Sequence, residues 1–272
     1  MDMNCKGTLV SLASPKVMGI LNITPDSFYE GSRVTEVNVL KRAEKMLSEG
    51  ADFLDIGGYS TRPNAAEVSQ EEELHRVVPV VKLLLKAFPT ARLSIDTFRS
   101  EVARQTLEEG ACIINDISAG LLDDKMLEVV AKYQVPYIAM HLVGTPQTMQ
   151  QRTHYESIIK EMLYYFSERK AKALSLGIND FVVDPGFGFS KTLDQNYEVL
   201  HNLEYFQELG CPILVGVSRK SMLYKLLDTT PQEALNATSV VNTIALMKGA
   251  HILRVHDVKE AKECITIYNK MR

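Results

Sequence analysis

Short apolar runs recur along the chain and alternate with stretches whose apolar residues have helical spacing. Eight of these runs are typical of buried strands. They cover residues 17–20, 53–56, 93–95, 112–114, 137–140, 181–183, 213–215 and 252–255. A regular alternation of strand and helix predicts parallel strands joined by helical crossovers.

Glycines mark the points where the predicted helices give way to strands. Gly50, Gly110 and Gly249 each precede an alanine and then an apolar run, and Gly177 and Gly210 occupy similar places. Glycine just past a helix adopts the left-handed conformation that closes the last turn. The sequence therefore predicts five helix-to-strand junctions.

Capping signals place the starts of two helices. Ser69 with Glu72 predicts a capping box, and Glu71-Glu72-Glu73 is typical of a solvated first turn without functional weight. Asp194 is the expected cap of a later helix. The apolar stripe of that helix is Tyr197, Leu200, Leu203 and Phe206. Pro79 predicts a kink or an early stop near Val78, because proline removes a helical donor.

About eight strand–helix units in 272 residues favour a single (β/α)₈ barrel over an open doubly wound sheet. No linker rich in Pro, Gly or Ser divides the chain. We therefore predict one domain, a (β/α)₈ TIM barrel over residues 1–272.

Composition narrows the class of protein. Thirty Lys and Arg against 34 Asp and Glu give a net charge of −4, which excludes a broad basic surface for nucleic acid. The four cysteines lie far apart and predict free thiols in a reducing compartment. With no apolar run of membrane-spanning length and no signal-peptide pattern, we expect a cytoplasmic protein without a membrane partner.

Polar residues follow nearly every predicted strand, where a barrel gathers its catalytic side chains. They are Asn22, Asp55, Asp96, Asn115 with Asp116, His141, Asp184, Ser218-Arg219-Lys220, and Arg254 with His256. Any one Asp or Asn of this kind is more often a turn or cap residue, but the whole set favours a site. Carboxylates and amides suit the edge of a heterocycle, and Arg with His suits an anion. No phosphate-binding glycine loop or zinc spacing is present.

The same segments resemble the dihydropteroate synthase family along nearly the whole chain. The two longest matches are residues 18–28 (MGILNITPDSF) and 55–63 (DIGGYSTRP). Shorter ones are 94–97 (SIDT), 114–117 (INDI), 144–146 (GTP), 184–189 (DPGFGF), 218–221 (SRKS) and 254–257 (RVHD). The resemblance implies a (β/α)₈ barrel that joins dihydropterin-6-ylmethyl diphosphate to 4-aminobenzoate and releases pyrophosphate.

The resemblance also implies roles for single residues. Those implied for the pterin ring are Asp96, Asn115, Asp184 and Lys220, and those for the diphosphate are Asn22, Arg62, Arg254 and His256, with Mg²⁺ near Asn22. Those implied for 4-aminobenzoate are Phe28, Thr61, Pro63 and Ser221. Catalysis is assigned to Asp26, Lys220, Arg62, Arg254 and His256, by departure of diphosphate before the amine attacks. A homodimer is expected, and sulfonamides are expected to compete with 4-aminobenzoate.

Two loops depart from the family pattern. Tyr29-Glu30 stands where relatives have Ser-Asp, Tyr59 stands where Glu is common, and Asn64 follows Pro63 in place of Gly. Two other functions remain open on the residues: a pterin-binding methyltransferase domain, and a non-catalytic pterin-binding paralogue. The methyltransferase has no use for a diphosphate site, and an intact catalytic set disfavours the paralogue.

Overall fold

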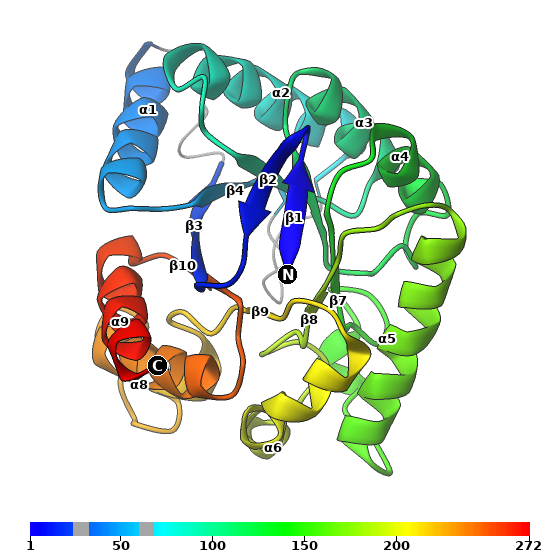
Figure 1. The fold of residues 1–272 in the computed structure, drawn as a ribbon, viewed down its shortest axis with the longest axis vertical. Helices are drawn as coiled ribbons and strands as arrows, with labels where there is room; N and C mark the ends of the chain where they lie inside the picture. Colours follow the sequence, from blue (N-terminus) through cyan, green and yellow to red (C-terminus); the bar gives the residue numbers. More distant parts are fainter. Residues whose placement is uncertain (24–32, 60–67) are drawn as a thin grey trace.

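Eight parallel strands form the centre of the molecule in the computed structural model, which describes residues 1–23, 33–59 and 68–272. Figure 1 looks along their common axis. The strands are β3 (Lys16–Asn22), β4 (Phe53–Gly57), β5 (Leu93–Asp96), β6 (Ile113–Asp116), β7 (Tyr137–Met140), β8 (Phe181–Asp184), β9 (Leu214–Val215) and β10 (Ile252–Val255). Their order is β8-β7-β6-β5-β4-β3-β10-β9, and a parallel bridge from Val183 to Ile213 joins the two ends. The predicted barrel is confirmed, and each strand lies within two residues of its predicted position.

Helices surround the strands on the outside of the barrel (Figure 1). They are α1 (Arg33–Ser48), α2 (Gln70–Ala87), α3 (Ser100–Glu108), α4 (Met126–Tyr133), α5 (Ile158–Ser175), α6 (Leu193–His201), α7 (Ser221–Tyr224), α8 (Leu235–Met247) and α9 (Val258–Met271), with 3₁₀ turns η2 (Met149–Gln151) and η3 (Leu203–Leu209). Within the described residues, no helix is both long and apolar enough to cross a membrane.

The strands are hydrophobic on both faces because each faces the barrel interior on one side and helices on the other. All four residues of β7 and of β8 are buried. The interior-facing side chains at the amino end of the barrel form one apolar cluster, and those facing the helices form a larger one.

An antiparallel hairpin of β1 (Asp2–Cys5) and β2 (Thr8–Ser11) crosses the amino end of the barrel (Figure 1). Its buried side chains join the interior cluster: Met3, Cys5 and Val10, next to Phe53 and Leu214 among others. The hairpin therefore seals the floor of the barrel. The sequence analysis did not predict these strands, because their apolar residues are too few to form a run.

The five predicted junction glycines all have positive φ, from 62° at Gly210 to 116° at Gly110. The Ser69 hydroxyl accepts a hydrogen bond from the Glu72 amide and caps α2, as predicted. The predicted cap at Asp194 is wrong, because Thr192, two residues earlier, caps α6 and forms a capping box with Gln195.

Two helix predictions need correction. The expected stop near Val78 is wrong, because α2 continues through Pro79 to Ala87. Pro79 lies on the exposed side, and Val77, Val80, Val81 and Leu84 remain packed in the core. The predicted stripe from Tyr197 to Phe206 is also split, since α6 ends at His201 and η3 continues from Leu203.

Candidate active site

The carboxyl ends of four neighbouring strands bring polar residues into one row. The strand registers pair Asn22 with Gly57, Gly57 with Asp96, and Asp96 with Asn115. A Cβ at Gly57 would lie 3.5 Å from Asp96 Oδ2 and 3.7 Å from Asn22 Oδ1. Glycine at this position therefore keeps open the space between the two side chains.

Arg254 at the end of β10 closes this row from the other side. Its Nε donates to Asp55 Oδ2 at 2.6 Å, and Nη2 donates to Asp96 Oδ2 at 2.7 Å. Asn115 Nδ2 donates to the same Asp55 oxygen at 3.0 Å. Nη1 of Arg254 makes no hydrogen bond within the described residues and remains available to a ligand. Asp55, which sequence reasoning left without a role, is thus the common anchor of Asn115 and Arg254.

Burial changes the proton affinity of Asp96. Desolvation raises the pKa of its carboxyl to about 7, although the Arg254 guanidinium opposes the rise and Asp55 adds to it. Asp96 therefore changes its charge near neutral pH.

Asp184 and Lys220 face each other across the ends of β8 and β9. The Gly186 amide donates to Asp184 Oδ1 at 2.8 Å, and Lys220 Nζ donates to the Phe187 carbonyl at 2.6 Å. Lys220 Nζ also lies 4.8 Å from the centre of the Phe189 ring. Burial raises the pKa of Asp184 and lowers the pKa of Lys220 to about 8, and the attraction between the two opposes both shifts.

Ser218 and His256 form a second polar pair at the mouth. The His256 amide donates to Ser218 Oγ at 3.1 Å, and this hydroxyl lies 3.0 Å from His256 Nδ1. Because Ser218 Oγ accepts from the amide, its proton can be donated to Nδ1, an arrangement that suits a neutral ring protonated at Nε2. Arg219, by contrast, makes a two-pronged ion pair with Asp257 at 2.8 and 3.0 Å and serves the fold.

Two of the polar residues that follow predicted strands do not reach the mouth. Asp116 accepts hydrogen bonds from Ser118, the Gly120 amide and the Tyr137 hydroxyl, all within the protein. His141 points toward α5, where its ring centre lies 4.9 Å from that of Tyr165. The contacts of Asp116 and His141 therefore indicate structural roles for these two residues and no role at the mouth of the barrel.

The acidic start of α2 is the predicted solvated turn at Glu71 and Glu72, which are exposed, but not at Glu73. Glu73 is fully buried and accepts from Arg99 at 2.5 Å. The same guanidinium donates to the Val68 carbonyl and lies over the rings of Tyr59 and Phe98, at 5.3 and 5.1 Å. The sequence does not show which of three adjacent glutamates is buried, because this depends on Arg99, a partner from another element.

The remaining predicted site residues divide into two groups. Asn22 and Ser221 are half-buried, at the end of β3 and the start of α7. Asp26, Phe28, Thr61, Arg62 and Pro63 lie outside the described residues, as do the departures at Tyr29, Glu30 and Asn64. No group of three or more metal-binding His, Cys, Asp or Glu side chains occurs in the described part of the chain.

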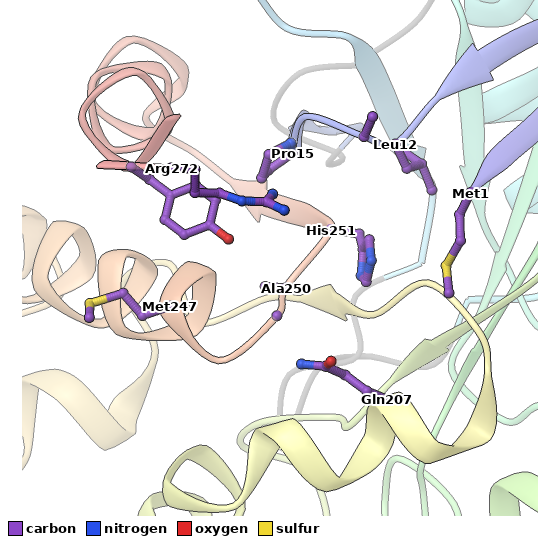
Figure 2. A pocket seen from close by; sticks show the side chains of 11 residues that line it. Met1, Leu12, Pro15, Gln207, Met247, Ala250, His251 and Arg272 are labelled. Atoms are coloured by element: carbon purple, nitrogen blue, oxygen red, sulfur yellow. The ribbon is translucent and has the colours of Figure 1, made fainter. Parts of the chain in front are cut away.

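A cavity of about 340 Å³ lies at the opposite end of the molecule (Figure 2). His251 and Pro15, which precede β10 and β3, line it together with Gln207 and Arg272. This is the floor of the barrel rather than its mouth, and the predicted site residues that the structure describes do not line it.

The chemistry of the mouth fits a flat, polar heterocycle next to an anion. Asp184, Asp96 and Asn115 offer acceptors and an amide, and Lys220 offers a cationic donor. Arg254 and His256 stand beside them and offer positive charge or donors to an anionic group.

Comparison with known proteins agrees with this chemistry. The model of a family described as pterin binding enzyme matches residues 18–256. The chain is 44% identical over 270 residues to dihydropteroate synthase of Escherichia coli K12, covering 98% of this chain and 95% of that one. It is 41% identical to dihydropteroate synthase of Haemophilus influenzae, covering 98% of each.

Solved structures give the same result. The Yersinia pestis dihydropteroate synthase in complex with a sulfonamide drug matches with a TM-score of 0.93 and 42% identity, over 100% of this chain and 99% of that one. The Xanthomonas albilineans enzyme with 4-aminobenzoic acid matches with a TM-score of 0.91 and 37% identity, over 99% and 97%.

The chain therefore belongs to the pterin-binding enzyme family. The full-length similarity places it more narrowly, among the dihydropteroate synthases, transferases of folate biosynthesis.

Proposed function

We propose that the mouth of the barrel binds the dihydropterin ring through Asp184, Asn115, Asp96 and Lys220. The observation that carries this proposal is the convergence of these four side chains from the ends of β5, β6 and β8 and from the start of α7. A carboxylate accepts two donors from the aminopyrimidine edge, and the Lys220 ammonium donates to the ring carbonyl. Asp55 acts by holding Asn115 and Arg254 in place.

The diphosphate is proposed to lie between Asn22, Arg254 and His256, with Arg62 as a further contact. Arg254 is supported by its position: two of its nitrogen atoms are fixed by Asp55 and Asp96, so the guanidinium is preorganised. Its fixed positive charge favours the departing diphosphate most strongly when negative charge has built up on it.

The residues near Asn22 fit Mg²⁺. The space that Gly57 leaves open is bordered by the Asn22 amide oxygen, an uncharged ligand that Mg²⁺ accepts. Mg²⁺ commonly takes one or two protein oxygens and completes its shell with water and substrate phosphate. When bound, it would add positive charge at the leaving group.

The proposed reaction proceeds by departure before attack. The carbon–oxygen bond to diphosphate breaks, the leaving group takes the electron pair, and the dihydropterin ring delocalises the cation left on the methylene. The 4-aminobenzoate nitrogen then forms the new bond and loses a proton. An aromatic amine is a weak nucleophile, so it gains from meeting a cation that is held in place and shielded from water.

The 4-aminobenzoate site is proposed to include Asp26, Phe28, Thr61, Pro63 and Ser221. The support is that the Xanthomonas albilineans relative has been solved with 4-aminobenzoic acid, and the Yersinia pestis relative with a sulfonamide drug. We expect sulfonamides to compete with 4-aminobenzoate and not with the pterin substrate.

One assay tests the function. The protein is mixed with dihydropterin diphosphate, 4-aminobenzoate and Mg²⁺, and pyrophosphate and dihydropteroate are measured, with a parallel reaction containing EDTA. Equal amounts of both products support the proposal, and loss of activity with EDTA supports Mg²⁺. Pterin binding without either product would favour the non-catalytic paralogue, and methyl transfer to a corrinoid would favour the methyltransferase.

We also propose a homodimer in the cytoplasm. Val240, Ile244 and Met247 lie at helical spacing on α8 and leave an apolar stripe exposed. The four buried free cysteines suit a reducing compartment. In sedimentation velocity, the double variant Val240→Glu, Ile244→Glu should be monomeric. Tyr164→Glu on α5 should leave a dimer unchanged, and an unchanged dimer in the double variant would move the interface elsewhere.

A further inference from the structure

Lys191 is a buried lysine for which the proposed reaction has no use. It lies just beyond the segment 184–189, and only 4% of its surface is exposed. Its Nζ lies 3.0 Å from the Gly186 carbonyl, 3.0 Å from the Phe189 carbonyl and 3.1 Å from His141 Nδ1. An ammonium has three protons, and here each has an acceptor.

The turn that Lys191 holds has an unusual backbone. Gly186, Gly188 and Ser190 all have positive φ, at 68°, 83° and 49°. A Cβ at Gly186 would collide with the His141 carbonyl oxygen, so the turn packs tightly on the end of β7. A backbone in such conformations persists only where surrounding contacts fix it. Both carbonyls bound by Lys191, those of Gly186 and Phe189, belong to this turn.

The same turn positions both ends of the proposed pterin site. The Gly186 amide orients Asp184, and the Phe187 carbonyl binds Lys220 Nζ. Lys191 contacts the carbonyl of Gly186 and the carbonyl two residues beyond Phe187. Displacement of the turn would therefore move Asp184 and Lys220 together.

We propose that Lys191 is a positioning residue for pterin binding, which fixes the turn 186–190 and through it the relative placement of Asp184 and Lys220. This inference rests on the proposed pterin site. Lys191 itself contacts no reacting group. His141 completes the arrangement from β7, as a neutral acceptor behind the lysine.

The charges around Lys191 agree with this role. Burial lowers its pKa to about 7, Asp184 opposes the shift, and Lys220 adds to it. Burial and the nearby Lys191 charge hold the pKa of His141 well below its usual range, so the imidazole stays neutral. Asp184 and the three acceptors thus favour the ammonium form of Lys191, against the effect of burial.

The test compares three variants by calorimetry with dihydropterin diphosphate and by steady-state kinetics. Lys191→Met removes the ammonium and keeps the length of the chain. Lys170→Met is the matched control, because Lys170 Nζ also donates to a carbonyl, that of Leu209, far from the mouth. Asp184→Asn reports on the pterin site itself.

We expect Lys191→Met to weaken pterin binding at least tenfold and to raise the KM for the pterin substrate, with the KM for 4-aminobenzoate unchanged. Lys170→Met should change neither. ¹⁵N NMR of His141 should show a raised imidazole pKa in Lys191→Met, a signature that a general loss of stability would not produce.

Three outcomes decide between the inferences. Normal pterin affinity in folded Lys191→Met with weak binding in Asp184→Asn would overturn the positioning role and keep the pterin site. Normal affinity in both would overturn the pterin site. If Lys191→Met does not fold, Lys191→Gln, which keeps a donor without the charge, takes its place. Failure of both to fold would overturn the positioning role in favour of a purely structural one.

Discussion

The Asp184 carboxylate illustrates how much one side chain contributes to recognition. One oxygen is held by the Gly186 amide, and the buried carboxylate faces the Lys220 ammonium. Asp184→Asn would place an amide NH₂ where two ring donors need an acceptor. We expect a loss of about 3 kcal/mol in pterin affinity, roughly a hundredfold, measured by calorimetry.

A matched control for this change is Asp123→Asn. Asp123 also accepts from a backbone amide, that of Ser100 at 2.7 Å, but it lies in the segment between β6 and α4 and binds the first residue of α3. It should leave pterin affinity unchanged. Near-normal affinity in a folded Asp184→Asn protein would show that the ring binds elsewhere.

Asp96 and Lys220 predict how pterin affinity changes with pH. Asp96 is ionised above its pKa of about 7, and Lys220 is charged below its pKa of about 8. If both charged forms bind the ring, affinity falls as the pH drops through about 7 and again as it rises through about 8. Loss of the Lys191 charge, whose pKa is also about 7, adds to the fall on the alkaline side. Binding of pterin diphosphate is measured from pH 5.5 to 9.5.

Lys220→Arg separates the two limbs of this profile, because the guanidinium stays charged over the whole range. The part of the alkaline fall that is due to Lys220 should disappear, the part that is due to Lys191 should persist, and the acid limb should remain, even if the overall affinity drops. An alkaline limb that persists unchanged would assign it to the ligand or to another group.

The second helix shows that an element can contribute to a buried ion pair with a neighbouring element, which its own sequence does not reveal. Glu73 of α2 is fully buried against Arg99, whereas Glu71 is exposed. Glu73→Ala leaves the Arg99 charge without its buried partner, which costs about 3 kcal/mol of unfolding free energy. Urea denaturation of Glu73→Ala and of Glu71→Ala measures the difference, and a loss in Glu71→Ala of similar size would contradict the assignment.

The elements differ in how well the sequence predicts them, for physical reasons. Strands such as Tyr137–Met140 are predictable because burial on both faces demands a continuous apolar run. The hairpin at Asp2–Cys5 is not, because it uses only alternate residues to seal the floor. The helix end predicted near Val78 is wrong because Pro79 removes only one backbone hydrogen bond. The packing of Val77, Val80 and Val81 stabilises α2 on both sides of the proline.

The site follows the same rule. Strand-end positions predict that Asp96, Asn115 and Asp184 come together, since parallel strands converge on one mouth. Which of the polar residues turns inward depends on packing partners distant in sequence, so His141 and Asp116 could not be separated from the rest. The position of Lys191, two residues after the segment 184–189, could have suggested that it lies near the site. Its three hydrogen-bond acceptors can be identified only in the folded turn.

At the scale of the whole molecule, the floor hairpin determines whether the barrel interior stays dry. Met3 is 1% exposed within the interior cluster, whereas Leu9 on the same hairpin is 72% exposed. Met3→Asp should destabilise the protein by about 3 kcal/mol or more, because a carboxylate would be buried without a partner. Leu9→Asp should change stability by less than about 0.5 kcal/mol. Thermal and urea unfolding of both variants measures this, and equal stability would mean that the hairpin is dispensable.

The barrel also has a seam. In the described part of the chain, β8 pairs with the segment that begins β9 through a single bridge, Val183 to Ile213, where the Val183 amide donates to the Pro212 carbonyl at 2.9 Å. Asp184 lies at the end of β8, and Lys220 follows β9. A pterin that binds both residues would therefore hold these two strands together. Hydrogen exchange should register this directly: the Val183 amide should exchange more slowly once pterin is bound. The control is the Leu54 amide, which donates to the Arg92 carbonyl between β4 and β5, on the opposite side of the barrel. It should exchange at an unchanged rate.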